Sequence, residues 1–223
     1  MMAATLPHHG RVAADDIPLL HVDAALIVAV KPSGMLAVPG RGEALQDCVA
    51  SRVQAHYPDA LVVHRLDMAT SGLLLLARGA AAQRRLSRQF AQREVGKTYV
   101  AVVAGRLARA EGEVDLPLAA DWPARPKQKV DAENGKPSLT RYRVMNFDPA
   151  SMTSRVELTP ITGRSHQLRV HLLAIGHPIL GDALYAPPAV QALASRLLLH
   201  AQALAFAHPL TGEPLRFESA PPF

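Results

Sequence analysis

The stretch HRLDMATSGLLLLAR, residues 64–78, decides the expected fold because it joins a charged turn to an almost unbroken apolar run. An apolar run bounded by small and charged residues predicts a buried strand over residues 71–78. Asp67 stands directly before this strand. A buried carboxylate costs free energy unless it is paired or hydrogen-bonded, so the position of Asp67 requires an explanation.

The remainder of the chain contains further strands separated by only a few helices. Strands are expected at 25–32, 97–105, 139–147, 153–161 and 197–208, and helices at 46–57, 81–94 and 165–176. The strands outnumber the helices and do not alternate with them regularly. This pattern predicts an α+β fold, with a mostly antiparallel mixed sheet and flanking helices. Residues 121–137 show no periodicity and contain three prolines, which predicts a long loop.

Length and composition indicate one domain. The chain has 223 residues, 49% of them hydrophobic, which is enough for one sizeable core. We expect a disordered leader at 1–17 and one folded domain at 18–223. No apolar run reaches the roughly 18 residues of a membrane span, and the N-terminus lacks a secretory pattern. The single cysteine, Cys48, excludes an intrachain disulfide and a zinc ribbon, so a cytoplasmic protein is expected.

The charge of the chain favours an anionic partner. The formal net charge is +5, and most of the positive charge is arginine, whose planar fork suits phosphate. Many ordinary enzymes are also basic. Net charge therefore makes RNA or DNA a plausible partner without establishing it.

The segment HRLD has two interpretations. In the structural one, Arg65 and Asp67 are solvated and His64 satisfies a nearby carbonyl group. In the functional one, the rigid strand holds the carboxylate of Asp67 as a nucleophile must be held. Thr70 and Ser71 then supply hydroxyl groups that can orient this carboxylate. The position of Asp67 favours catalysis.

A second motif, ITGRSHQLRVHLLAIGHPILGDALY (161–185), places Arg164, His166 and Arg169 near the N-terminal half of a helix. Such a helix end with two arginines predicts an anion site. A structural helix with a solvated basic face is the alternative. His166 and His171 are five residues apart, so they do not share a helix face as two zinc ligands would.

Two further segments carry weaker signals. Tyr99 alternates with apolar residues in KTYVAVVAG (97–105), which is typical of a core tyrosine with a bonded hydroxyl group. Arg125, Lys127 and Lys129 alternate along the expected loop. They form either a solvated charge run or a mobile clamp for a phosphate backbone.

Four of these stretches together resemble a known family. HRLDMATSGLLLLA, KTYVAVVAG, GRSHQLRVHLLAIGHPILGD and RLLLHAQALAFAHP are similar to the successive signature motifs of the RluA-type pseudouridine synthases, from about Pro18 to the end of the chain. Many members carry an N-terminal S4 RNA-binding domain, for which too little chain precedes IPLLHVDAALIVAVKPSG here. Within the family, HRLDMATSG, DWPARPKQKV and PITGRSHQLRVH resemble members that modify a loop of 23S rRNA and the tRNA anticodon stem-loop.

The resemblance implies a role for each residue that matches a motif. Asp67 would attack either the uracil ring or the ribose C1′, and Arg169 would be its ion-pair partner. Tyr99 would stack on the target uracil, and Arg65 would enter the space vacated by the flipped uridine. The remaining matches, all expected to bind substrate, are His64, Thr70, Arg164, His166, Leu199, Arg125, Lys127 and Lys129.

Small departures and open alternatives accompany this assignment. Ser165 and Leu168 stand where the family often has threonine and isoleucine, and both keep the chemistry intact. The resemblance implies no metal and no cofactor, and it makes residues 18–223 a bare catalytic domain. Nothing in the sequence suggests a dimer, so a monomer is expected. One alternative is a catalytically silent RNA-binding protein of the same fold. Another is a nucleoside hydrolase, which would need a second carboxylate to activate water, and none stands out near the motifs.

Overall fold

The computed structural model describes residues 12–14 and 17–223. The expected leader at 1–17 therefore lies largely outside the described residues. Within it, β1 (Val12–Ala14) pairs antiparallel with β2, whose first residue is Ile17. No helix in the described part of the chain is both long and apolar enough to cross a bilayer.

The main sheet confirms the expected α+β class. Its strands lie in the order β1-β2-β3-β5-β12-β6-β11-β10-β7, with β4 added beside β5 and β13 beside β12. All of these pairs are antiparallel except β5 with β12. The strands are β2 (Ile17–Val22), β3 (Leu26–Lys31), β4 (Ala60–Val62), β5 (Ser71–Arg78), β6 (Gly96–Ala104), β7 (Glu111–Asp115), β10 (Leu139–Asp148), β11 (Thr153–Pro160), β12 (Leu199–Ala207) and β13 (Pro214–Glu218).

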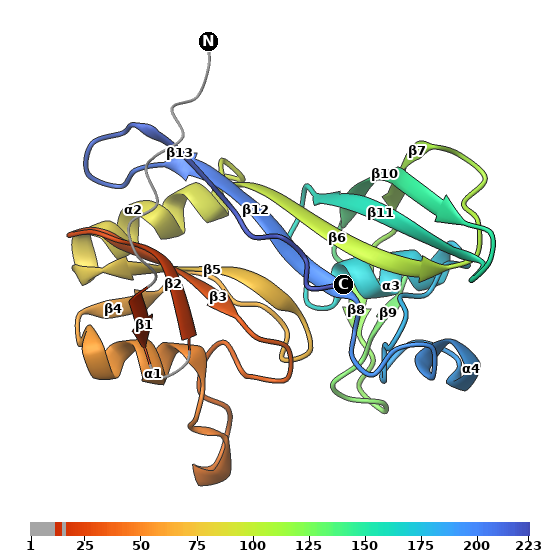
Figure 1. The fold of residues 1–223 in the computed structure, drawn as a ribbon, viewed down its shortest axis with the longest axis horizontal. Helices are drawn as coiled ribbons and strands as arrows, with labels where there is room; N and C mark the ends of the chain where they lie inside the picture. The colour runs from red at the N-terminus through yellow and green to blue at the C-terminus, as the bar shows by residue number, and fades with distance from the viewer. Residues whose placement is uncertain (1–11, 15–16) are drawn as a thin grey trace.

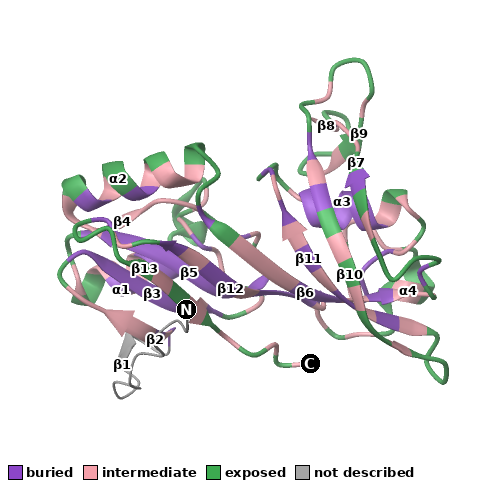
Figure 2. Ribbon diagram, turned by 90° about the horizontal axis from the view of Figure 1, so that it is seen from above, coloured by how far each residue is buried: buried purple, intermediate pink, exposed green. Residues whose placement is uncertain are grey.

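Both faces of β5 are covered, which explains its unbroken leucine run. Leu74 and Leu76 pack with α1 (Val49–His56) in one apolar cluster, whereas Leu73 and Leu75 pack with α2 (Gly79–Ala91) in another. Figure 2 shows the buried strands between the two helices, and α2 with its outer face exposed. A strand buried on both faces has no polar side to alternate with.

The molecule has two halves joined by two long strands. Figure 1 shows β1–β5, α1 and α2 on one side, β7, β10, β11 and α3 (Gln167–Ala174) on the other, and β6 and β12 running between them. The parallel pairing of β5 with β12 covers only two residue pairs, Ser71 with His200 and Gly72 with Ala201. The two halves of the sheet are therefore joined at the end of β5 that adjoins Asp67.

The second half has its own apolar core. Leu168 and Leu172 of α3 pack against Val103 of β6 and Leu158 of β11. His171 on the same helix is fully buried, and its two ring nitrogens are hydrogen-bonded to Thr140 Oγ1 and the Leu116 carbonyl oxygen. His171 is therefore a structural residue, as its spacing from His166 indicated.

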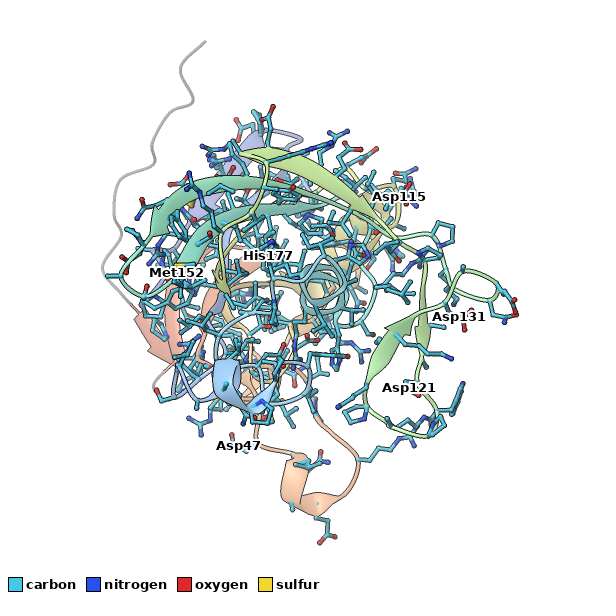
Figure 3. The ribbon with its side chains drawn as sticks, turned by 90° about the vertical axis from the view of Figure 1, so that its right-hand side faces the viewer. Asp47, Asp115, Asp121, Asp131, Met152 and His177 are labelled. Atoms are coloured by element: carbon cyan, nitrogen blue, oxygen red, sulfur yellow. The ribbon has the colours of Figure 1, made fainter. Side chains whose placement is uncertain are left out.

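The expectation of a structureless loop at 121–137 is wrong in part. β8 (Leu118–Ala120) and β9 (Gln128–Val130) form a separate two-stranded sheet, so this segment is a hairpin with a seven-residue connection at 121–127. Figure 3 shows the hairpin projecting from the body, with Asp121 and Asp131 at its two ends. Three-residue strands leave too short an alternation to be read from the sequence.

Element ends differ modestly from the expected ranges. The helix expected at 46–57 begins at Val49, and buried Cys48 caps it by accepting a hydrogen bond from the Ser51 amide. The helix expected at 165–176 begins at Gln167, so Arg164 lies in the preceding turn. Short helices were not expected at η1 (Glu43–Leu45) and α4 (Pro188–Gln191).

Candidate active site

A cleft of about 470 Å³ lies where the two halves meet. It brings together residues from distant segments, including the turn before β5, strand β6, the segment before α3 and the start of β12. Nine of the residues singled out in the sequence line it: His64, Arg65, Asp67, Thr70, Tyr99, Arg164, His166, Arg169 and Leu199. The motifs thus converge on one site.

Asp67 lies in a turn that the rest of the protein holds in place. Its side chain is 29% exposed, so the carboxylate is open to the cleft. Behind it, fully buried Lys31 donates hydrogen bonds from Nζ to the carbonyl oxygens of Pro32, Met35 and Met68, at 2.7, 2.6 and 2.8 Å. Lys31 therefore pins the residue that follows the catalytic candidate, a role that the sequence did not reveal.

Arg169 contacts two carboxylates, of which only one was expected. Its Nε and Nη2 donate to Asp182 at 2.8 and 2.6 Å, whereas its Nη1 lies 3.6 Å from Asp67 Oδ2. The expected ion pair between Arg169 and Asp67 is therefore present, but Asp182 is the closer partner of Arg169. Asp182 is 1% exposed and takes the bidentate pair, because only a deeply buried carboxylate needs both hydrogen bonds.

The pair with Asp182 stabilises the positive charge of Arg169 at the cleft. Burial opposes the charge of Arg169, but the hydrogen bonds and the negative charge of Asp182 outweigh it and raise the pKa of the guanidinium group. Asp182 is also the second carboxylate that sequence reasoning did not find. Its Oδ1 further accepts from the amides of Leu184 and Tyr185, so it is not available to activate a water molecule. The hydrolase alternative gains no support.

His166 approaches Asp67 from the other side. Its Nε2 lies 3.8 Å from Asp67 Oδ1, and its Nδ1 is hydrogen-bonded to the Tyr185 hydroxyl at 2.6 Å. The backbone of His166 is left-handed, with φ of 56°. Burial lowers the pKa of the ring, and the charge of Asp67 opposes this effect only in part. His166 is therefore a neutral imidazole held in a costly backbone conformation.

Tyr99 and Leu199 come from the two strands that cross the molecule. Both line the cleft, and Tyr99 packs partly buried against the apolar clusters on either side. Burial raises the pKa of the Tyr99 phenol, and the nearby charge of Asp67 raises it further. Tyr99 is therefore a neutral ring, available for stacking on a planar ligand.

His64 and Arg65 differ in their surroundings. The Leu75 amide donates to His64 Nε2 at 2.9 Å, and the ring stacks on Phe90 with centroids 4.6 Å apart. Burial lowers the pKa of His64 to about 3, so this ring stays neutral. Arg65 is exposed at the cleft rim.

Two basic residues of the cleft were missed. Lys97 and Arg93 line it, and burial lowers the pKa of Lys97, with the nearby charge of Arg93 adding to this effect. Lys97 stands two residues before Tyr99, so the same side of β6 carries both. That period of two is the signal that could have identified it.

The turn before α3 is organised by Gln167. Its Oε1 accepts from the Thr162 hydroxyl and the Arg164 amide, at 2.7 and 3.0 Å. Its Nε2 donates to the Leu139 carbonyl and Thr140 Oγ1. Arg164 precedes the helix and Arg169 is bound to Asp182, and the anion site expected at this helix end stays a prediction.

The three basic residues of the hairpin lie outside the cleft. Arg125, Lys127 and Lys129 belong to the 121–130 segment, and none of them lines it. Lys129 Nζ is 3.5 Å from Asp131 Oδ2, which partly neutralises it. No cluster of three metal-binding side chains occurs among residues 17–223, the part with described side chains.

A family model described as RNA pseudouridylate synthase matches residues 25–174. The dual-specificity RNA pseudouridine synthase RluA of Yersinia pestis is 56% identical over 200 residues, which are 90% of this chain and 97% of that protein. The protein of the same name from Escherichia coli K12 is 55% identical over 205 residues, 92% of this chain and 93% of that protein.

Two solved human structures have a similar fold. Human RNA Pseudouridylate Synthase Domain Containing 1 superposes with a TM-score of 0.79 at 27% identity, covering 96% of this chain and 87% of that one. Human RNA Pseudouridylate Synthase Domain Containing 4 gives a TM-score of 0.71 at 26% identity, covering 92% and 88%. Both span the two halves that form the cleft.

Proposed function

We propose a reaction and a substrate from one premise: the chain belongs to the RNA pseudouridylate synthase family, and it is an isomerase that converts uridine in RNA to pseudouridine. Asp67 is the catalytic nucleophile. The observation that supports this proposal is the convergence of Asp67, Tyr99 and Arg169, which are 102 residues apart at most in sequence, on one cleft. The reaction needs an ionised carboxylate, a surface on which the uracil stacks and a positive charge near the carboxylate, and these three side chains supply them in that order.

The reaction needs a carboxylate that stays ionised beside a uracil. Arg169 Nη1, 3.6 Å from Asp67 Oδ2, supplies positive charge without neutralising the nucleophile through a close pair. The carboxylate attacks either the ring or the ribose C1′, and the bond between N1 and C1′ breaks. The uracil rotates, its C5 bonds to C1′, and the bond to Asp67 breaks. C5 then loses its proton and N1 takes one up. These steps require no hydrolysis and no change of redox state.

A uracil inside a stem-loop must leave its stack to reach Asp67. Tyr99 and Leu199 provide an aromatic and an aliphatic wall for the flipped base. Flipping costs a few kcal/mol, least in a loop, and an exposed cation can occupy the vacated space. Arg65 at the cleft rim has the exposure and the charge for this role.

The hairpin provides a second contact with the RNA. Trp122 is 67% exposed, and the guanidinium carbon of Arg125 lies 3.4 Å from the centroid of its ring. Exposed aromatic rings and arginine planes are the surfaces on which splayed bases stack. Lys127, also in the connection, adds positive charge for the phosphate backbone.

The substrates we infer are a loop of 23S rRNA and the anticodon stem-loop of tRNA. The printed names of the relatives from Y. pestis and E. coli describe them as dual-specificity enzymes, and this chain covers over nine-tenths of both. We further propose that the protein acts as a monomer in the cytoplasm, where both RNAs occur.

The test is tritium release from RNA that carries uridine tritiated at C5. Pseudouridine formation must expel this hydrogen, whereas hydrolysis of the glycosidic bond or mere binding leaves it in place. We expect release from a 23S rRNA fragment and from an unmodified anticodon stem-loop. Asp67→Asn removes the charge but keeps the shape, so it should abolish release.

Two controls make this test specific. Trp122 is the only tryptophan, so quenching of its fluorescence measures RNA binding and should persist in Asp67→Asn. Asp47→Asn alters an exposed aspartate paired with Arg52 and should release tritium normally. Normal release by Asp67→Asn would exclude Asp67 as nucleophile, and release from one RNA alone would exclude dual specificity.

A further inference from the structure

A chain of contacts connects the hairpin to the catalytic carboxylate. The Gln128 amide at the start of β9 donates to the Tyr185 hydroxyl at 2.8 Å, and this hydroxyl bonds His166 Nδ1 at 2.6 Å. His166 Nε2 then faces Asp67 Oδ1 at 3.8 Å. Residues from four separate segments of the chain are thus connected by three consecutive contacts.

The donors and acceptors in this line have one consistent direction. A backbone amide can only donate, so the Tyr185 oxygen accepts from Gln128. Among the described residues, the Tyr185 hydroxyl has two hydrogen-bond partners, the Gln128 amide and His166, and only His166 can accept its proton. We infer that the hydroxyl proton points to His166 Nδ1. A neutral imidazole that accepts at Nδ1 carries its hydrogen at Nε2, and here that hydrogen faces Asp67.

The surroundings hold Tyr185 firmly. Its amide donates to Asp182 Oδ1 at 3.2 Å, and the guanidinium carbon of Arg169 lies 4.9 Å from the centroid of its ring. The His166 and Tyr185 rings meet edge to face, 5.5 Å apart. Tyr185 therefore contacts both groups that approach Asp67, although it does not line the cleft itself.

The two approaches to Asp67 are complementary. Arg169 Nη1 faces Oδ2 and His166 Nε2 faces Oδ1, so each carboxylate oxygen faces a different side chain. A distance of 3.8 Å exceeds a hydrogen bond, and active-site hydrogen bonds often shorten only when substrate binds. The left-handed backbone of His166 indicates that its ring orientation is imposed by its surroundings.

We propose that Tyr185 is a positioning residue: it selects the His166 tautomer whose Nε2–H orients the carboxylate of Asp67. Because Tyr185 receives its own hydrogen bond from Gln128, the orientation of the nucleophile also depends on a docked hairpin. This inference rests on the proposed role of Asp67. It adds a residue outside the cleft and a dependence on the segment that we propose to contact RNA.

The first experiment uses Tyr185→Phe, which keeps the aromatic ring and removes only the hydroxyl group. We expect the single-turnover rate of tritium release to fall roughly ten- to a hundredfold, as misplacement of a reacting group does, with RNA affinity unchanged. Tyr57→Phe, which removes a hydroxyl group outside the cleft, is the matched control and should react normally.

A double-mutant cycle separates positioning from a general structural role. If Tyr185 acts through His166, the Tyr185→Phe change has no further effect on the rate in a His166→Ala background. An equal loss in both backgrounds, or no loss in the first, would overturn the proposal. A structural role would also lower the urea midpoint in parallel with the rate.

The second experiment reads the tautomer directly and needs no turnover. Long-range ¹⁵N–¹H spectra distinguish the two neutral tautomers, and the His166 signal among ten histidines is the one absent from His166→Ala. We expect hydrogen at Nε2 in the native protein and loss of this preference in Tyr185→Phe. Hydrogen at Nδ1 in the native protein would overturn the inference, even if the enzyme is active. Absence of tritium release with the expected tautomer would instead contradict the proposed reaction.

Discussion

Arg169 forms a bidentate pair with Asp182 and also lies near Asp67. Its fork is filled by Asp182, which leaves Nη1 3.6 Å from Asp67. An unpaired Arg169 would be costly to bury, since its side chain is 4% exposed. The pair with Asp182 therefore stabilises the buried guanidinium group while Asp67 stays open to the cleft.

Asp182→Asn should therefore destabilise the protein strongly. The change keeps the side-chain shape but leaves the buried Arg169 charge without its counter-charge, which typically costs about 3–5 kcal/mol. Urea denaturation measures the free energy of unfolding. Asp59→Asn, which breaks a more exposed pair with Arg78, is the control and should cost less than about 1 kcal/mol. Equal losses in the two variants would contradict this account.

Buried His200 makes stability depend on pH. Its Nδ1 is 2.9 Å from the Ser71 hydroxyl and its Nε2 is 3.1 Å from the Ser219 carbonyl oxygen. Because Nε2 must donate to the carbonyl, Nδ1 accepts from Ser71, and a protonated ring would lose this hydrogen bond. Burial lowers the pKa of His200 to about 4, against an ordinary value of 6.5, with the charge of Arg196 adding to this effect.

A depressed folded-state pKa means that the unfolded chain takes up the proton first as the pH falls. The contribution of His200 is therefore fully present above pH 6.5 and is lost between pH 6.5 and about 4, by up to roughly 1.4 kcal/mol per pH unit. Urea midpoints measured from pH 4 to 8 should show this slope. His200→Gln should reduce this slope, the remainder coming from groups such as buried His64, and an unchanged slope would contradict the role of His200.

At the scale of elements, β5 positions Asp67 through its junction with β12. Gly72 has φ of 115°, in the region that favours glycine, and a Cβ atom there would collide with the backbone of Ala201. This close approach allows the two-residue parallel pairing that joins the halves. Ser71 and Gly72, at the start of β5, therefore form the junction with β12 and also follow the turn that contains Asp67.

Gly72→Ala should separate β5 from β12. The new methyl group meets backbone atoms rather than a flexible side chain, and the positive φ adds strain of order 1–3 kcal/mol. We expect a lower thermal midpoint together with slower tritium release. Gly176→Ala is the control: Gly176 also has positive φ, but a Cβ atom there meets nothing within 4 Å. If both variants lose the same stability, the collision with Ala201 is unimportant.

At the scale of the whole molecule, the two halves share one cleft and the hairpin extends beyond it. The turn at 64–70 comes from one half, whereas the hairpin at 118–130 packs with α3 on the other. An RNA loop that inserts a base beside Asp67 while its backbone lies on the hairpin must therefore contact both. Charge favours this arrangement, since the chain carries a net charge of +5.

Hydrogen exchange should report this two-part contact. In the free protein we expect slow exchange in β5, β6 and β12 and fast exchange in the 121–127 connection, because exposed segments with few packed contacts open most easily. Adding an anticodon stem-loop to Asp67→Asn should protect both 64–70 and 118–130. Protection of only one of these segments would contradict a substrate that bridges the halves.

The sequence by itself determined the elements and motifs whose signals are local. The leucine run of β5 is apolar on both faces, the 3.6-residue stripe of α2 contains Leu86 and Phe90, and Asp67, Tyr99 and Arg169 lie in long motifs. The α+β class followed from the order of these elements. The short strands β8 and β9 were missed because three residues carry almost no periodicity.

Only the tertiary structure decided which partners these residues have. The sequence does not show the contacts that Asp182, Tyr185 and Lys31 make beside the cleft. No spacing in the chain indicates that Asp182 rather than Asp67 forms the bidentate pair with Arg169. The two carboxylates differ in burial: the more deeply buried one forms the bidentate pair with Arg169, and the more exposed one stays open to the cleft. Burial is a property of the packed chain, so this division of roles arises only once the two halves have come together.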